Sequence, residues 1–383
     1  MIDKPLHITV GAVPTVDAGN IRILAHELSI AKAAILYADK VNLCSGGVAL
    51  ATNLHSRLTG NLSLTEQAEL FLDFLPVMPF EQDEVWKVKM VAPLLEEFIT
   101  LSRRNPLLLT RRQRESLREK APMLEQVLAP LQDQLLEKVK EFGMDEVQPA
   151  VEGGVLDIHD FGLGVRDLNN MERMTPKFLE LVQETLLSLD THPLFDPDTA
   201  RLVERGLASG NFSVAPTAEK RGKQTGLVAN LFERLPVLDI PMRELLDVRS
   251  ELLRPLTHFR AEMTALSSGI ASAQWNETFP SDVDDIVQSR INPAIAEIAD
   301  ELERLRLRNF VPSRLVDKAD ALALGGAAAY GIGAAVAPLA GVLVALGSAA
   351  IFTEAAFADF QSRKAAIERN ELYFYYRLRE LAT

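Results

Sequence analysis

Three side chains that could bind a divalent cation stand close together near the middle of the chain. Asp157, His159 and Asp160 lie at the end of a short apolar run, residues 155–158, and before a loop that contains glycine. Carboxylate oxygens and imidazole nitrogens are common ligands of divalent metals. If the apolar run is a strand of a parallel sheet, its end lies where such sheets bind ligands. The sequence therefore allows a divalent metal site with these three residues as ligands and as catalytic candidates.

Further aspartates could join this cluster from neighbouring strand ends, namely Asp17, Asp39 and Asp239. An acidic cluster built in this way would resemble the arrangement in metal-dependent nucleases of the PIN type, which hold magnesium with carboxylates. The resemblance lies in the expected topology, because no stretch of the chain matches a PIN motif. Aspartates at strand ends also commonly cap the next helix or begin a turn, and Asp17 and Asp239 are placed to do so. We favour this structural role and keep a metal-dependent nuclease or phosphodiesterase-like enzyme as the alternative.

Several motifs that identify enzymes are absent from the sequence. Thr225 follows Gly222-Lys223-Gln224, but a phosphate-binding loop needs glycine where this chain has Thr217. There is no His-Glu-x-x-His, no Gly-x-Ser-x-Gly and no pair of cysteines. The single cysteine, Cys44, is expected to be a small buried hydrophobic side chain rather than a nucleophile. We expect no organic cofactor, and a divalent metal is the one cofactor that the residue pattern allows.

The start of the chain predicts a β-α-β unit. Residues 7–13 form an apolar run that ends at Pro14, and residues 40–44 form a second run. Between them, residues 21–37 repeat apolar side chains every three and four positions, as a helix with one buried face does. A crossover of this kind pairs its two strands in parallel. The sequence therefore predicts a small parallel sheet near the N-terminus.

The tetrapeptide Val-Leu-Asp-Ile occurs at 155–158 and again at 237–240, and both copies are expected to join this sheet. Helical patterns fill most of the remaining chain. Residues 63–143 predict a helical insertion that begins at Ser63 and that prolines divide (Pro76, Pro79, Pro106, Pro122 and Pro130). The predicted fold class is mainly α, α+β, with the small parallel sheet, the helical insertion and a C-terminal helical region.

Two long amphipathic helices are predicted after residue 240. One runs from Pro241 for about 25 residues and should kink at Pro255, and the other spans roughly 282–308. A helix is also predicted for 175–189. We expect an α/β-like core over residues 1–240 and a helical region over residues 241–383.

Residues 321–352 carry no charge and include twelve alanines and six glycines. Small side chains allow helix backbones to approach closely, so we expect two tightly packed helices around a break at Pro338. The positions that matter most to this contact are Gly325, Gly333, Pro338, Gly341 and Gly347. Two alternatives remain: a hairpin that enters a membrane when triggered, and a permanent transmembrane anchor.

The formal net charge of −13 disfavours a protein whose main task is to coat nucleic acid or an anionic membrane, and nucleic acid is an unlikely partner. The one basic concentration, between Arg103 and Lys120, is interleaved with Glu115 and Glu119 and predicts a solvated helix face. One cysteine and no signal peptide at the start predict a cytoplasmic protein. We expect a non-enzymatic interaction or effector protein that acts through helical surfaces. Its partner would be another protein or a second copy of the chain, and a membrane is possible through residues 321–352.

Overall fold

The computed structural model describes residues 5–13, 24–74, 85–162, 171–310 and 361–381. The chain divides into two compact units. The first contains Met1–Glu251 and Leu266–Val283, and the second contains Leu252–Ala265 and Asp284–Thr383. The Ala/Gly-rich segment 321–352, with Gly325, Gly333, Pro338, Gly341 and Gly347, lies outside the described residues.

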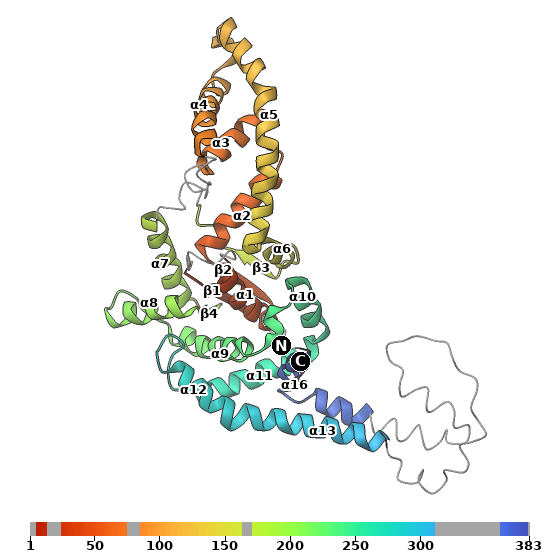
Figure 1. Cartoon of the computed structure of the whole chain (residues 1–383). Coiled ribbons are helices and arrows are strands. Elements are labelled where there is room, and N and C mark those ends of the chain that lie inside the picture. The colour runs from red at the N-terminus through yellow and green to blue at the C-terminus, as the bar shows by residue number, and fades with distance from the viewer. Residues whose placement is uncertain (1–4, 14–23, 75–84, 163–170, 311–360, 382–383) are drawn as a thin grey trace, which may run out of the picture. The chain divides into compact units, whose positions relative to one another are not determined.

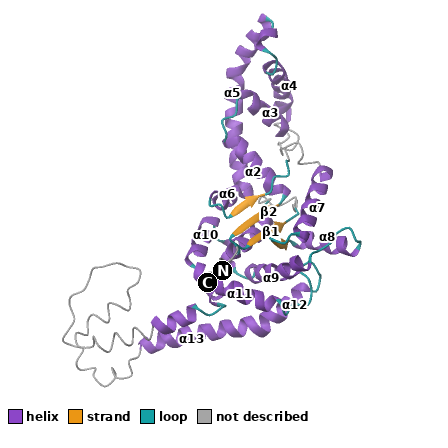
Figure 2. Ribbon diagram, turned by 180° about the vertical axis from the view of Figure 1, so that it is seen from behind, coloured by secondary structure: helices purple, strands orange, loops and turns teal. Residues whose placement is uncertain are grey.

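A four-stranded parallel sheet forms the centre of the first unit, and helices surround it (Figure 2). Its strands are β1 (His7–Gly11), β2 (Lys40–Cys44), β3 (Leu156–Ile158) and β4 (His192–Phe195), in the order β3-β2-β1-β4. Helix α1 (Ala25–Tyr37) connects β1 to β2, so the predicted β-α-β unit is confirmed. The predicted fold class, mainly α with a small parallel sheet near the N-terminus, is confirmed as well.

One strand prediction was wrong and one strand was missed. The second Val-Leu-Asp-Ile copy lies in the 3-10 turn η4 (Pro236–Asp239), because Pro236 and Pro241 flank it and neither can donate a ladder hydrogen bond. The fourth strand is instead β4. It has only four residues and contains Pro193, which a parallel sheet accepts here because β4 lies at the edge.

The helices of the first unit bury the sheet and each other. Helix α9 (Pro216–Glu233) contacts β4 and α1, and α7 (Met171–Leu187) contacts β4 and α9. Helices α6 (Asp145–Glu152) and α10 (Met242–Glu251) contact each other, and α10 also contacts α1. One core cluster joins α7 to the sheet and includes Cys44, Phe178, Val182, Phe195 and Trp275.

The helical insertion forms an arm that consists of α3 (Leu64–Phe74), α4 (Val85–Ser102), the 3-10 turn η1 (Pro106–Leu108) and α5 (Arg111–Val139). It follows α2 (Gly46–Thr59), which contacts α5. Both views show α3, α4 and the first half of α5 extending beyond α2, away from the sheet (Figures 1 and 2). The arm has its own apolar core, which consists of Ala68, Phe71, Leu95, Phe98, Leu124 and Leu128.

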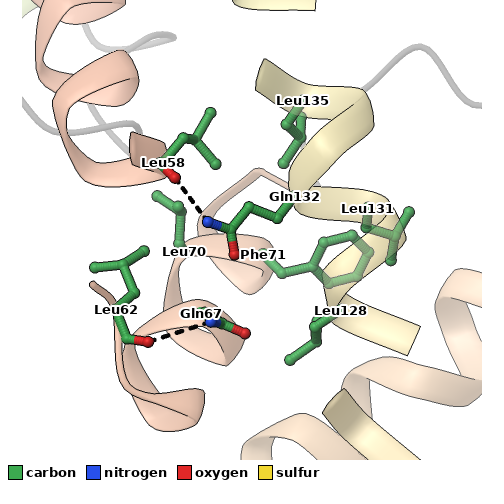
Figure 3. A pocket seen from close by; sticks show the side chains of 9 residues that line it. All are labelled: Leu58, Leu62, Gln67, Leu70, Phe71, Leu128, Leu131, Gln132 and Leu135. Atoms are coloured by element: carbon green, nitrogen blue, oxygen red, sulfur yellow. Dashed lines mark hydrogen bonds between the residues drawn. The ribbon is translucent and has the colours of Figure 1, made fainter. Parts of the chain in front are cut away.

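Where the arm joins α2, a small hollow lies between α2, α3 and α5 (Figure 3). Leucines and Phe71 line most of it, and there is room for about one water molecule. The Gln132 amide donates a hydrogen bond of 2.6 Å to the Leu58 carbonyl across it. The hollow is therefore a packing defect at the base of the arm rather than a ligand site.

Prolines 122 and 130 do not divide the insertion as predicted, because α5 runs through both without interruption. Both prolines are exposed on the outer face of α5. The carbonyls that lose their helical partner can therefore be hydrated, while Leu124 and Leu128 keep the inner face packed. The predicted stop at Gly143 is confirmed: this residue has a φ of 114° and separates α5 from α6.

The second unit contains α11 (Leu253–Ser267) up to Ala265, the described part of α13 (Asn292–Phe310) and α16 (Tyr373–Leu381). Its core is aromatic, since the buried rings of Phe259 and Phe374 lie 5.3 Å apart between centroids. Where the sequence predicts a kink at Pro255, the structure has a helix break at Leu252, which separates α10 from α11. The break forms because Pro255 has no N–H to donate to the carbonyl of Glu251. The helix predicted for 282–308 is divided into α12 (Phe279–Ile286), a π turn and α13.

Among the helices that the structure describes, none is both long and apolar enough to cross a membrane.

Candidate functional site

The three residues proposed as metal ligands each have a local partner. The Asp157 carboxylate pairs with the Lys40 ammonium at 2.7 Å, and both side chains are about half exposed. The Asp160 carboxylate accepts a hydrogen bond of 2.7 Å from the Gly162 N–H and so closes a turn. The His159 ring meets the Phe161 ring edge-on, with centroids 4.8 Å apart. Among the described residues, no three histidine, cysteine, aspartate or glutamate side chains gather into a group that could hold a metal ion, and this includes Asp157, His159 and Asp160. Metal binding by these three residues stays a prediction.

The other aspartates considered from the sequence lie elsewhere. Asp39 precedes β2, at the amino edge of the sheet, and its carboxylate accepts a hydrogen bond of 2.7 Å from the Leu6 N–H. Asp239 is exposed at the end of η4. Asp17 lies outside the described residues. Asp39 therefore lies at the amino end of the strands, whereas Asp160 follows β3 at their carboxyl end, and the expected cluster at one set of strand ends does not include Asp39.

Two fully buried carboxyl groups that sequence reasoning missed lie where the strands end. Asp196 directly follows β4, and Glu27 lies in the first turn of α1; both are 0% exposed. The chain order along the sheet reverses between β1 and β4, and in open parallel sheets ligands bind beyond the strand ends at this switch point. Glu27 could have been noticed as one of only two charges on an apolar helix, the other being Lys32.

Asp196 joins three parts of this region. One carboxylate oxygen accepts a hydrogen bond of 2.7 Å from the Thr199 N–H and so caps α8 (Pro197–Ala208). The other accepts from the Val13 N–H at 3.2 Å and lies 3.3 Å from Nε2 of His26. These contacts supply the partners that a buried carboxylate requires. Asp196 therefore holds the end of β1, the start of α8 and His26 together.

Glu27 is less completely satisfied. The Ser45 hydroxyl donates a hydrogen bond of 3.3 Å to Oε1, but Oε2 is buried and has no partner among the described residues. Burial raises the pKa of Glu27, against the opposing effects of Ser45 and of His26. A carboxyl group whose pKa is raised by burial keeps its proton to a higher pH than an exposed one does. His26, with 42% of its side chain exposed, contacts Asp196 at 3.3 Å and acts on Glu27 through its charge.

Cys44 is buried at the end of β2, as predicted, and carries no reactive thiolate. Burial raises the pKa of its thiol to about 12. The thiolate, which is the nucleophilic form, is therefore scarce at neutral pH.

The far end of the arm is the second candidate site. We define the arm tip as residues 103–114; it contains five arginines and no acidic residue. Leu107 and Leu108 are 88% and 79% exposed, more than any other large hydrophobic side chain described. Two of the arginines have acidic partners, since Arg103 pairs with Glu69 and Arg111 pairs with Glu115. Within the described part of the chain, no carboxylate pairs with the others, which are Arg104, Arg112 and Arg114.

Comparison of the chain with protein-family models, curated proteins and solved structures found no match.

Proposed function

We propose that the chain is an interaction protein without catalytic activity, that it works in the cytoplasm, and that the arm is its main contact element. The observation that supports this proposal most is the exposure of Leu107 and Leu108 at the arm tip. Burial of two adjacent exposed leucines releases free energy, so a complex in which a partner surface covers them would be stabilised. The Ala/Gly-rich segment 321–352 belongs to the same proposal as a second contact element, on its sequence alone.

The length and the internal contacts of the arm hold its tip away from the sheet. Helix α5 has 29 residues, or about 43 Å of helix. A capping box at Thr110 and Gln113 fixes its start, and a second one at Ser63 and Glu66 fixes the start of α3. The arm core and the ion pair between Lys120 and Glu97, at 2.5 Å, join α4 to α5. This construction favours a rigid contact element over a loose loop.

Site-specific photocrosslinking tests this role. A photoreactive amino acid replaces Leu107 in the full chain, and the same amino acid at Leu189, which is 65% exposed and lies outside the arm, is the matched control. In cells, we expect crosslinked products that form from position 107 and not from position 189. The absence of any product at 107, with protein or with lipid, or the same products at both positions, would contradict a contact role for the tip.

A second candidate function is supported by the unpartnered oxygen of Glu27 beside His26 and Asp196. We propose as the alternative a metal-dependent phosphodiesterase or nuclease whose carboxylates lie at the strand ends. Oxygen ligands suit magnesium or manganese, and the unpartnered Oε2 of Glu27 would be one such ligand. Asp157, His159 and Asp160 are the other candidate set, predicted from the sequence, although the described residues do not gather them into a group that could hold a metal ion.

Thermal unfolding with and without magnesium or manganese tests this alternative. A ligand of the folded state raises the unfolding midpoint, so an enzyme of this kind should be stabilised by one of these ions. Loss of the increase in Glu27→Gln would assign the ion to the switch point, and loss in Asp157→Asn with Asp160→Asn would assign it to the first set. An unchanged midpoint with both ions would remove the enzyme alternative.

A further inference from the structure

We propose that the arm tip docks onto an anionic lipid bilayer, with Leu107 and Leu108 entering the interface and the arginines contacting the lipid phosphates. The inference rests on the proposed role of the arm as a contact element and names the surface that it contacts. The tip combines two features that strengthen binding to the surface of an anionic bilayer, exposed leucines and clustered basic side chains.

Side-chain hydrogen bonds within the tip fix its conformation. Among the three consecutive leucines, Leu109 is buried at 7% exposure while Leu107 and Leu108 face outward. The Asn105 side chain accepts a hydrogen bond of 3.0 Å from the Leu107 N–H and caps η1. The Thr110 side chain caps α5 immediately after it. The two outward leucines are therefore held by an ordered turn, so their exposure is a fixed property of the tip.

The position of the leucines favours lipid over a folded protein partner. Figure 1 shows the connection between α4 and α5, which contains η1, at the far end of the arm, where the chain projects from the rest of its unit. A protein partner would need a pocket shaped for both side chains, whereas a bilayer accommodates a projecting apolar tip without a preformed cavity. A projecting tip also reaches a flat surface before the rest of its unit does.

Charge supplies the second argument. The chain as a whole carries −13, so an anionic surface repels it, but the arm tip carries five arginines and no acidic residue. Arg104, Arg112 and Arg114 have no acidic partner in the part of the chain that the structure describes. Each arginine near an anionic leaflet strengthens binding, and its long apolar stem can lie along the interface while the guanidinium meets phosphate.

Vesicle flotation with the full chain tests the inference. The vesicles contain either phosphatidylcholine alone or equal parts of phosphatidylcholine and phosphatidylglycerol. We expect binding to the mixed vesicles that weakens as salt is added, and at least about tenfold weaker binding to phosphatidylcholine alone. Equal binding to both vesicles, or to neither, would overturn the inference.

Two sets of variants assign the binding to the tip. Leu107→Ser with Leu108→Ser should weaken binding to mixed vesicles about tenfold, and Leu187→Ser with Leu189→Ser, which are 51% and 65% exposed in the wild type, should not change it. Replacement of Arg104, Arg112 and Arg114 by glutamine should reduce binding and its salt dependence. Unchanged binding in the tip variants would show that another segment, such as 321–352, contacts the lipid, and would overturn the inference.

The crosslinking experiment separates this inference from the proposed function. Protein products at position 107 without vesicle binding would refute the lipid surface and leave the arm as a protein contact element. No products at position 107 and no vesicle binding would refute both.

Discussion

A buried carboxyl group with one unpartnered oxygen makes stability depend on pH. Glu27 is such a group, and burial raises its pKa above the ordinary value of 4.5. A raised pKa in the folded state means that the fold favours the protonated form, so its contribution to stability is present below pH 4.5 and is lost as pH rises through the folded pKa. Because glutamine does not ionise, Glu27→Gln should be more stable than the wild type near neutral pH, with the gain shrinking towards pH 4. Urea unfolding of both proteins across this range measures the difference, and a gain that does not vary with pH would refute the assignment.

Gly143 tests the close approach between the end of α5 and α1. A Cβ atom at this position would lie 2.6 Å from Cδ1 of Leu28, and the φ of 114° is unfavourable for any other residue. We expect Gly143→Ala to lower the free energy of unfolding by about 2–4 kcal/mol, from backbone strain and overpacking together.

The matched control for Gly143 is Gly154→Ala. Gly154 also has a positive φ, 67°, but a Cβ atom added there would meet nothing within 4 Å, so only the backbone cost of about 1–2 kcal/mol applies. Equal losses in the two variants, measured by urea unfolding, would show that the Leu28 contact contributes nothing.

At the scale of elements, a mutation in the arm core should destabilise all three helices of the arm together. Leu95 is 0% exposed and packs among the residues of the arm core, so Leu95→Ala should cost about 2–5 kcal/mol. Hydrogen exchange should then accelerate at amides throughout α3, α4 and α5. Leu107→Ala, which truncates an 88% exposed leucine in the same arm, should leave exchange unchanged. Exchange in the arm that is no faster in Leu95→Ala than in Leu107→Ala would contradict the separate core.

The elements differ in how far the sequence predicts them, for physical reasons. The pattern of α1 and its flanking strands identifies a β-α-β unit because buried faces repeat with the period of the element. β4 is harder to recognise: it is four residues long, contains a proline and owes its place to Phe195 and to the pairing with β1. Val237–Ile240 has a strand-like composition, but the prolines on either side decide its conformation. Composition predicts an element well only where the backbone is free to follow it.

The candidate sites were harder to predict than the fold. Glu27 and Asp196 are 169 positions apart in sequence, and only the pairing of β1 with β4 brings His26 and Asp196 within 3.3 Å. Asp157 and Asp160, which are close in sequence, have exposed local partners instead. At the arm tip, the arginines are visible in the sequence, but the outward direction of Leu107 and Leu108 beside the buried Leu109 depends on the η1 turn.

At the scale of the whole molecule, two compact units with separate cores should lose protection separately. Phe374 is 0% exposed, and its ring packs against Phe259 in the second unit. Phe374→Ala should cost about 3–5 kcal/mol, and the loss should appear as faster hydrogen exchange in α11, α13 and α16. The matching variant in the first unit is Phe232→Ala, whose wild-type side chain is also 0% exposed, and it should accelerate exchange in the sheet and α9 instead. If either variant accelerates exchange equally in both units, the chain unfolds as one cooperative body, because separately stabilised cores would have confined the effect to the unit that carries the mutation.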